Sequence, residues 1–143
     1  MWIRNFILCK KYPFLRIRNV WNGEKYGYKR TELDFLPKGW NKAFGTKICK
    51  DIKAALKKSS DENFWKKTYR ITQIKEKYGE LRWYDFGVPH DVFDDYEQVM
   101  EKYEEISKKT CYKCGKEAKM RNLNGWYEPL CDKCNKEFFE KGF

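Results

Sequence analysis

The stretches Cys111-Tyr112-Lys113-Cys114-Gly115 and Cys131-Asp132-Lys133-Cys134, with sixteen residues between Cys114 and Cys131, decide how the last third of this chain is built. Each CxxC pair can place two thiolates on one tight turn, and two such turns facing each other complete a tetrahedron. Gly115 allows the chain to turn sharply behind the second cysteine. The spacing therefore predicts a four-cysteine metal site of the zinc-ribbon or treble-clef-like kind.

The ligand type indicates which metal this site would hold. Four thiolates select zinc or an iron–sulfur centre, and a short two-knuckle site with no further cysteines nearby favours Zn²⁺. Four protein ligands leave no coordination position open, so we expect a structural rather than a catalytic ion. Two disulfides are the alternative, which the absence of a signal peptide before the first elements argues against.

The remaining cysteines and the single histidine offer little chemistry. Cys9 and Cys49 have no histidine close in sequence, and we expect both to be small buried residues. His90 follows Pro89 at the start of an acidic segment, so we expect it at a turn or helix start.

Length and composition set the scale of the fold. The chain has 143 residues, of which 18% are aromatic and 36% charged. It can build one domain with a core rich in Trp, Tyr and Phe, together with a small metal module. No apolar run approaches the roughly 20 residues that span a membrane, so we expect no membrane partner. We predict an α+β body over residues 1–108 and a zinc-binding module over residues 109–143.

The net charge of +10 is unevenly distributed. Residues 1–88 carry 21 Lys and Arg against 9 Asp and Glu, whereas residues 89–107 carry one Lys against seven acids. A basic front with an acidic helix behind it would attract a polyanion or an acidic protein face. The alternative is a solvated lysine-rich surface without a partner.

Two helices are expected in the body. Trp40, Phe44, Ile48, Ile52 and Leu56 recur every four residues, which predicts a core-facing helix ending near residue 57. Residues 91–107 repeat apolar side chains at helical spacing and have acids in the first turns, where the helix dipole favours them. The inner stripe of this second helix consists of Val92, Tyr96, Val99, Tyr103 and Ile106.

Hairpins are expected to form a small antiparallel sheet against these helices. Residues 12–21 alternate as a strand and Asn22-Gly23 is a strong turn signal, with residues 25–29 returning. A second hairpin is expected over residues 64–86, with one strand from Trp65 to Ile74, a turn at residues 77–80 and a return strand over residues 81–86.

The second hairpin carries the candidate partner-binding residues. Alternation places Leu81, Trp83 and Asp85 on one face and the residues between them on the other. Nucleic-acid bases can stack on Trp or Tyr while Lys and Arg hold phosphate. The candidate set is Lys75, Lys77, Arg82, Trp83 and Tyr84. The same residues could instead form a sheet core with a cationic rim.

Within the metal module, residues 120–130 read as a short hairpin that turns at Asn124-Gly125. Trp126 is expected to cover the metal site or to dock the module on the preceding helix. Residues 135–143 are expected to form a short helix or a frayed tail, with Phe138 and Phe139 as anchors.

Three motifs occur in order along the chain: LPKGWNKAF at residues 36–44, YRITQIKEKYGELRWYD at residues 69–85, and the two cysteine pairs with Gly125-Trp126 and PLCDKC at residues 129–134. In this order they resemble a group of small zinc-ribbon proteins of bacterial phages and prophages, over residues 12 to 134. The resemblance implies a small protein in the cytoplasm of an infected or lysogenic bacterium, acting on a host or defence component.

Some metal-binding phage proteins of this kind inhibit CRISPR nucleases. The resemblance therefore implies a non-enzymatic anti-CRISPR protein whose partner is a bacterial protein, most specifically a type II CRISPR effector nuclease. Many such inhibitors are acidic mimics of nucleic acid, whereas this chain is basic. It would have to bind an acidic patch on the nuclease or block nucleic-acid loading.

Two other functions compete with this one. A basic zinc-ribbon regulator that binds nucleic acid is favoured by the net charge and the Lys/Arg/Trp/Tyr hairpin. An enzyme is disfavoured, because the sequence has no nucleotide-binding glycine loop, Ser-His-Asp set or open metal site. Asp85, Glu76, Lys75 and His90 could be assembled into a nuclease site, but most basic proteins offer four such residues. We therefore expect no enzymatic activity and no small-molecule substrate.

Overall fold

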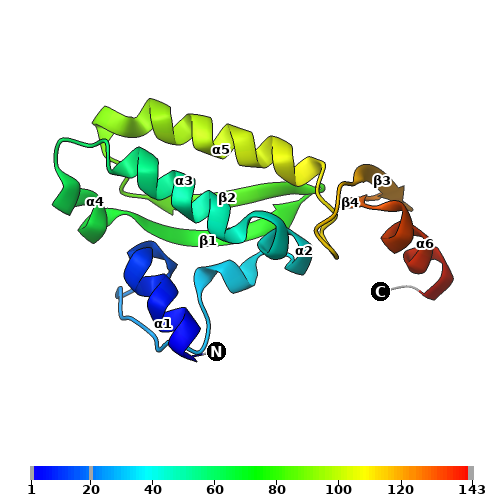
Figure 1. Ribbon diagram of the computed structural model, residues 1–143, viewed down its shortest axis with the longest axis horizontal. Helices are drawn as coiled ribbons and strands as arrows, with labels where there is room; N and C mark the ends of the chain where they lie inside the picture. The colour runs from blue at the N-terminus through cyan, green and yellow to red at the C-terminus, as the bar shows by residue number, and fades with distance from the viewer. Residues whose placement is uncertain (1, 20, 142–143) are drawn as a thin grey trace.

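The computed structural model describes residues 2–19 and 21–141. The α+β body contains one antiparallel hairpin, β1 (Arg70–Lys77) and β2 (Glu80–Phe86), and a smaller C-terminal part contains a second, β3 (Lys119–Leu123) and β4 (Trp126–Leu130). Figure 1 shows the second hairpin at one end of the body, beyond the tip of the first.

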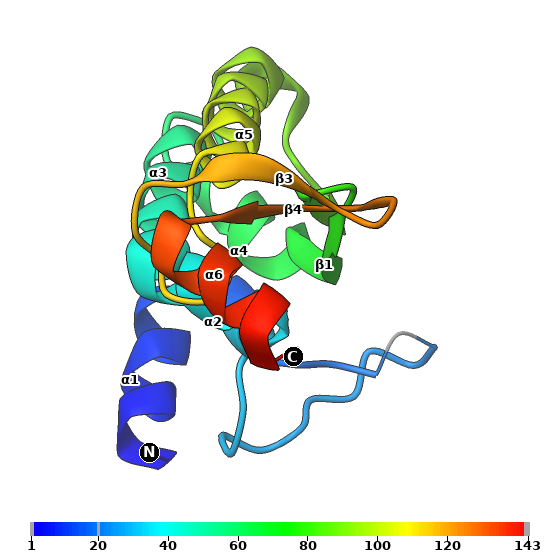
Figure 2. The ribbon, with the colours of Figure 1, turned by 90° about the vertical axis from the view of Figure 1, so that its right-hand side faces the viewer.

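Helices cover the body hairpin and close the C-terminal part. They are α1 (Trp2–Lys11), α2 (Lys38–Trp40), α3 (Thr46–Leu56), α4 (Glu62–Thr68), α5 (Phe93–Lys108) and α6 (Asp132–Lys141). A π-helical stretch, η3 (Asn41–Gly45), joins α2 to α3, and short 3₁₀ turns lie at η1 (Pro13–Leu15), η2 (Glu32–Phe35) and η4 (His90–Val92). In Figure 2, α6 lies beside β3 and β4, and α1 lies at the opposite end of that view from α5.

Both helices expected from apolar spacing are confirmed. The segment from α2 to α3 is continuous, and its stripe from Trp40 to Leu56 is buried in the main core. α5 packs across β2 and along α3 (Figure 1), where the hydroxyl of Tyr103 donates to the Asp51 carboxylate over 2.5 Å. His90 lies in the turn η4 that leads into α5, as predicted.

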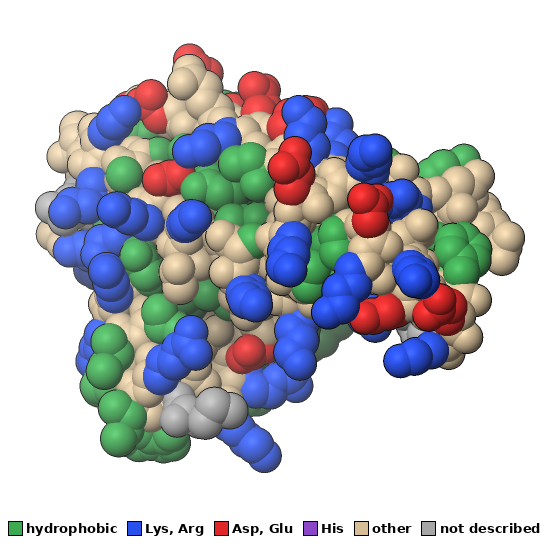
Figure 3. Space-filling view, turned by 45° about the vertical axis from the view of Figure 1, so that its right-hand side comes forward, with side chains coloured by type: hydrophobic (Ala, Val, Ile, Leu, Met, Phe, Trp, Pro, Cys, Tyr) green, Lys and Arg blue, Asp and Glu red, His purple; other side chains and the backbone are tan. Residues whose placement is uncertain are grey.

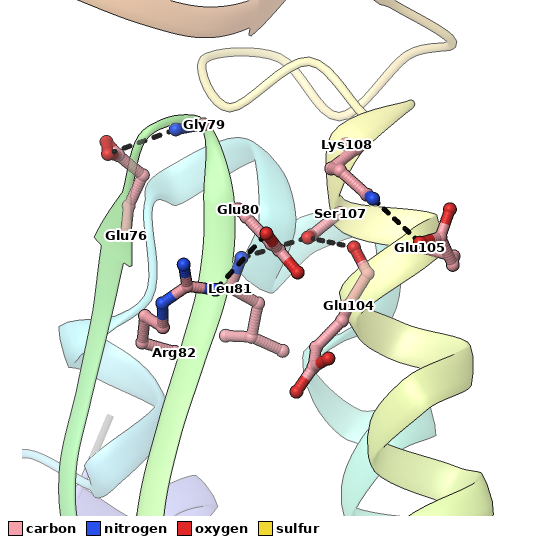
Figure 4. Close-up of polar contacts among 9 residues, drawn as sticks. All are labelled: Glu76, Gly79, Glu80, Leu81, Arg82, Glu104, Glu105, Ser107 and Lys108. Carbon is pink, nitrogen blue, oxygen red and sulfur yellow. Dashed lines mark hydrogen bonds and ion pairs between the residues drawn. The ribbon is translucent and has the colours of Figure 1, made fainter.

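The β1–β2 hairpin turns at Tyr78 and Gly79, both with positive φ, as the turn residues predicted. Leu81 and Trp83 face the core, while Tyr84 is exposed. Ser107 of α5 fastens the hairpin: its Oγ accepts the N–H of Leu81 over 3.0 Å and donates to the Glu104 carbonyl over 2.6 Å (Figure 4). Ser107 is fully buried, so this is a dry polar contact between α5 and β2.

The strand expected from Trp65 is wrong in its first half. Residues 62–68 form α4, because the Asp61 side chain caps the helix by accepting the N–H of Phe64 over 3.1 Å. Trp65 is buried in the core from this helix, and the strand begins only at Arg70. The cap therefore outweighs the β-propensity of the aromatic residues.

The strand expected over residues 12–21 is also wrong, and its Val20 lies outside the described residues. Pro13 begins the turn η1, which buries Phe14 and Leu15 side by side instead of alternating them. Of the expected hairpin with residues 25–29, one isolated bridge between Arg18 and Lys25 forms. Residues 16–19 and 21–30, called the strap below, run along the surface and are not part of the sheet.

The helix α1 was not expected, because its apolar side chains do not form a single inward stripe. Cys9 and the half-buried Leu8 pack on the core, whereas Ile3 and Ile7 are exposed. Asn5 ties the helix to the strap by donating to the carbonyls of Tyr28 and Lys29 over 2.8 and 3.0 Å.

Buried apolar residues fall into a large cluster in the body and a small one around the cysteines. Tyr112 contacts both clusters. The division into residues 1–108 and 109–143 stays a prediction. None of the described helices has the length and apolar character needed to cross a bilayer.

Candidate metal centre

The four cysteines of the two CxxC pairs converge as the spacing predicted. Cys111 and Cys114 lie on the turn that follows α5, and Cys131 and Cys134 lie at the start of α6. All four sulfur atoms lie within 4.8 Å of one another, and the Cys114 and Cys131 sulfurs are 3.6 Å apart. A tetrahedral zinc with bonds of about 2.3 Å would hold its sulfurs about 3.8 Å apart. All six cysteines are free thiols, so the disulfide alternative is wrong for this structure.

Backbone hydrogen bonds shape the first knuckle. The N–H of Gly115 donates to the Cys111 carbonyl over 2.8 Å, and the N–H of Cys111 donates to the Lys116 carbonyl over 2.7 Å. Gly115 has a φ of +86°, which only glycine adopts readily. At the second pair, the N–H of Cys134 donates to the Cys131 sulfur over 3.4 Å. N–H groups aimed at sulfur favour thiolates over thiols.

The thiols differ in how readily they ionise. Burial opposes ionisation of Cys111, but hydrogen bonds from the backbone of Cys131, Cys114 and Lys113 outweigh it and lower its pKa to about 7. Burial raises the pKa of Cys134 well above the ordinary range, with further contributions from the other thiols, and it also raises the pKa of Cys114. Neighbouring thiolates repel one another, and a bound cation would offset this repulsion. Metal binding would therefore favour the ionised cysteines and release protons.

The cluster is closed by protein. Cys111, Cys131 and Cys134 are buried and Cys114 is half-buried. Leu123 and Leu130 of the β3–β4 hairpin pack beside them, together with the half-buried Phe138 of α6. Within the described chain this is the single group of three or more His, Cys, Asp or Glu residues that could hold a metal ion. Four sulfur donors in an apolar shell suit a structural ion.

The first knuckle docks on the body through Gly39, which the sequence analysis did not single out. A Cβ at this position would lie 2.2 Å from the Cys111 carbonyl oxygen and 2.6 Å from the Gly115 nitrogen. The Gly39 N–H donates to the Tyr112 carbonyl over 2.8 Å, and the Trp40 indole donates to the Thr110 carbonyl over 2.9 Å. The motif LPKGW therefore contains the contact that fits the cysteine turn against α2.

Trp126 does not cover the metal site and does not dock the module on α5, so that expectation is wrong. Its ring is 66% exposed, and its indole N–H donates to Oε1 of Glu128 over 2.5 Å. Glu128 itself is buried, and its second carboxylate oxygen has no partner among the described residues. Of the two expected anchors in α6, Phe138 packs on the module and Phe139 is exposed.

The predicted partner-binding residues share one face of the body hairpin, with one exception. Lys75 lies opposite Arg82 in the register, and its ammonium sits 5.7 Å from the centre of the Tyr84 ring. Lys77 is exposed and lies near the Tyr78 ring. Trp83 points to the opposite face, is buried, and donates its indole N–H to the Tyr69 hydroxyl over 3.1 Å. A partner could not stack on Trp83.

Arg82 lies in acidic surroundings. Its guanidinium forms an ion pair with Glu80 over 3.2 Å (Figure 4), and Glu104 of α5 lies near enough for its charge to interact with that of Arg82. Burial raises the pKa of Glu104, and the neighbouring Glu80 raises it further while Arg82 lowers it. The positive charge of Arg82 is thus partly neutralised within the protein, which weakens this face as a phosphate-binding surface.

The residues of the nuclease hypothesis are not brought together. Asp85 and His90 line a cleft of about 520 Å³ between β2 and α5. The Asp85 carboxylate there accepts hydrogen bonds from Tyr69 and Tyr96, and burial raises its pKa despite them. Glu76 and Lys75 instead line a separate cleft beside Tyr112. The four residues therefore share no common site.

Comparison of the chain with protein-family models, with curated proteins and with solved structures finds no match. The four-cysteine cluster is the feature that geometry supports most directly.

Proposed function

We propose that this chain is a non-enzymatic interaction protein whose C-terminal part is held together by zinc. The observation that favours a protein partner is the outer face of α1. Trp2, Ile3 and Ile7 are 60%, 66% and 58% exposed on this one short helix. Neighbouring exposed apolar side chains of this size are typical of protein-binding surfaces.

Zinc is the proposed ion, bound by Cys111, Cys114, Cys131 and Cys134. The order of a cysteine turn, a hairpin and a helix that carries the second pair supports a treble-clef-like module over a zinc ribbon. The ion would act structurally, because its binding energy would contribute to the folding energy of residues with a very small core of their own.

The proposed target is a bacterial defence component, most specifically a type II CRISPR nuclease, which the chain would bind and inhibit in the cytoplasm of the bacterial cell. The sequence resemblance to small phage proteins supports this target. The basic charge of +10 supports an acidic patch on the nuclease as the contact.

A cleavage assay with a purified, guide-loaded type II nuclease tests this function. Added chain should slow cleavage of target DNA, and Ile3→Glu with Ile7→Glu should abolish that inhibition by placing charge in the apolar contact. Phe139→Glu is the matched control, because Phe139 is equally exposed on α6, away from α1. Unchanged cleavage in the presence of wild-type chain would rule out the proposed target.

A nucleic-acid-binding regulator is the second candidate function. The observation in its favour is the pairing of cations with aromatic rings on the outer hairpin face, Lys75 with Tyr84 and Arg70 with Phe86. Lys77→Ala with Arg82→Ala should weaken partner binding without unfolding the chain. A pull-down from bacterial lysate with and without nuclease digestion separates the two functions, because a protein partner survives digestion and a nucleic-acid partner does not.

A further inference from the structure

A polar cleft of about 790 Å³ separates α1 from the helical segment α2–η3. Lys29 and Arg30, from the segment before η2, also line it. Five cations from these three elements line it: Arg4, Lys29, Arg30, Lys38 and Lys42. All five side chains are exposed. Residues from segments far apart in sequence thus place positive charge around one concave site. No single basic run in the sequence would have predicted this site.

A single carboxylate, that of Asp34, lines the cleft beside these five positive charges in the described part of the chain. This carboxylate already accepts the N–H of Thr31 over 2.7 Å. None of the five cations forms an ion pair with the described carboxylates. In contrast, Arg82 on the hairpin face is paired with Glu80. The cleft is therefore the better site for an external anion.

A second cleft of about 470 Å³ adjoins the first, and Lys38 lines both. It runs from Phe35 towards the first cysteine turn and is also lined by Lys75, Glu76, Tyr112 and Lys113. Because both clefts are lined by Lys38, we describe them together as one groove, which extends from Arg4 of α1 to Lys113 of the first cysteine turn. Figure 3 shows Lys and Arg as the most widespread charged side chains over the body, with many of the Asp and Glu side chains towards its upper edge.

An aromatic platform lies where the two clefts meet. Phe35 is 45% exposed, and the guanidinium of Arg30 lies 5.2 Å from the centre of its ring. An exposed aromatic ring beside cations provides a surface on which an unpaired base can stack while its phosphates meet the cations. A duplex is usually read by an element that projects into its groove, whereas this site is concave.

We propose that this groove binds single-stranded nucleic acid, with the five cations holding the phosphate backbone and Phe35 stacking a base. This site is additional to the proposed protein partner and does not depend on it. The groove also differs from the outer hairpin face described above. Lys75 lies at the border between the two and lines one end of the groove. The charge and the stacking platform come from separate side chains, so they can be tested separately.

The test measures fluorescence anisotropy of a labelled ~12-nucleotide oligodeoxythymidylate with the zinc-loaded full chain between about 50 and 200 mM salt. Lys29→Gln with Lys38→Gln should weaken binding at least tenfold and reduce the salt slope by about 1.4, since each single-strand phosphate contact contributes about 0.7. Phe35→Leu should weaken binding about tenfold and leave the salt slope unchanged.

Lys57→Gln with Lys67→Gln is the charge-matched control, because both lysines are exposed and line neither cleft of the groove; they lie at the end of α3 and in α4. It should leave affinity within about twofold and the slope within about 0.5 of wild type.

An equal loss of affinity in the groove and control variants would refute nucleic-acid binding in the groove, as would the absence of binding by wild type. Displacement by polyglutamate as effective as by unlabelled oligonucleotide would assign the groove to an acidic peptide instead. Retained nuclease inhibition by the groove variants would show that the protein-binding function stands apart.

Discussion

At Gly39 the body and the first cysteine turn meet without room for a side chain. Gly39→Ala would place a methyl group 2.2 Å from the Cys111 carbonyl oxygen, so one of two backbones must move. We expect a loss of about 2–3 kcal/mol in the free energy of unfolding, together with weaker metal retention under a chelator. Urea unfolding of the zinc-loaded protein measures the loss of stability.

Gly27→Ala is the control, since nothing lies within 4 Å of its added Cβ, and it should change stability by less than about 0.5 kcal/mol. Equal stability of the two variants would contradict the docking contact.

The cysteine ligands provide a second prediction at this scale. Cys111→Ser and Cys134→Ser should each remove the bound zinc and destabilise the protein by about 3 kcal/mol or more, because the ion's binding energy stabilises the folded module. Elemental analysis gives the metal content and thermal melting the stability. Cys9→Ala and Cys49→Ala should keep a full metal content, because both thiols are buried in the body cluster. Wild-type melting by both ligand variants would exclude a structural ion.

Single residues show where reading the sequence succeeds. Cys111, Cys114, Cys131 and Cys134 could be identified because thiolate spacing is a strict local signal. Trp83 and Trp126 could not be placed, because the burial of a strand residue depends on which face meets the core. The groove cations were missed for a related reason: Arg4, Lys29 and Lys38 become neighbours only after α1 packs.

Among the elements, the contact between α5 and β2 depends on one hydroxyl group. Ser107→Ala would leave the buried N–H of Leu81 without an acceptor, so we expect a loss of about 1–3 kcal/mol. Chemical denaturation measures it. Thr72→Ala serves as the comparison, because Thr72 is exposed at the irregular point of β1 and should be nearly neutral. A neutral Ser107→Ala would mean that water replaces the hydroxyl.

Elements with long apolar periods were predictable and short ones were not. The helices α3 and α5 repeat apolar residues over several turns, so their pattern survives any tertiary context. Residues 12–21 and 65–69 look like strands locally, but Pro13 and the Asp61 cap determine a turn and a helix there. In short segments one capping or turn residue outweighs several weak propensities.

At the scale of the whole molecule, a pair of carboxyl groups joins the body hairpin to the metal module. Glu128 of β4 is buried near Glu76 of β1; burial, followed by the influence of the nearby Glu76 carboxyl group, raises the pKa of Glu128 to about 8. A protonated Glu128 can donate to Glu76 across the contact, which would satisfy its otherwise unpartnered oxygen.

This pair predicts a pH dependence of stability. The pKa of Glu128 is higher in the folded protein than in the unfolded chain, so its contribution is fully present below about pH 4.3 and is lost as the pH rises to about 8. Between pH 6 and 8 we expect wild type to lose about 2 kcal/mol more than Glu128→Gln, which stays uncharged. Urea unfolding of both zinc-saturated proteins measures this difference. Protonation of the cysteine ligands also depends on pH, but it affects both proteins equally and therefore does not contribute to the difference between them. Parallel pH profiles would contradict the shared proton.

Removing the metal should affect the two clusters unequally. Chelation should release hydrogen-exchange protection from β3, β4 and α6, whose cluster contains the cysteines, while α3 and α5 keep most of theirs. Exchange mass spectrometry with and without chelator shows this directly. Uniform loss of protection would mean that the chain unfolds as one unit, and unchanged protection would mean that no ion is needed.

The meeting of Gly39 with the turn at Cys111 also orders events during synthesis. A ribosome adds Gly39 about seventy residues before the cysteines that it must contact. The helices and hairpin of the body can collapse first, with the start of α2 uncovered until the cysteine segment emerges. If the proposed ion binds there, docking of this segment on Gly39 would be a metal-dependent closure, and the rate at which a cell supplies the metal would set how much newly made chain completes it.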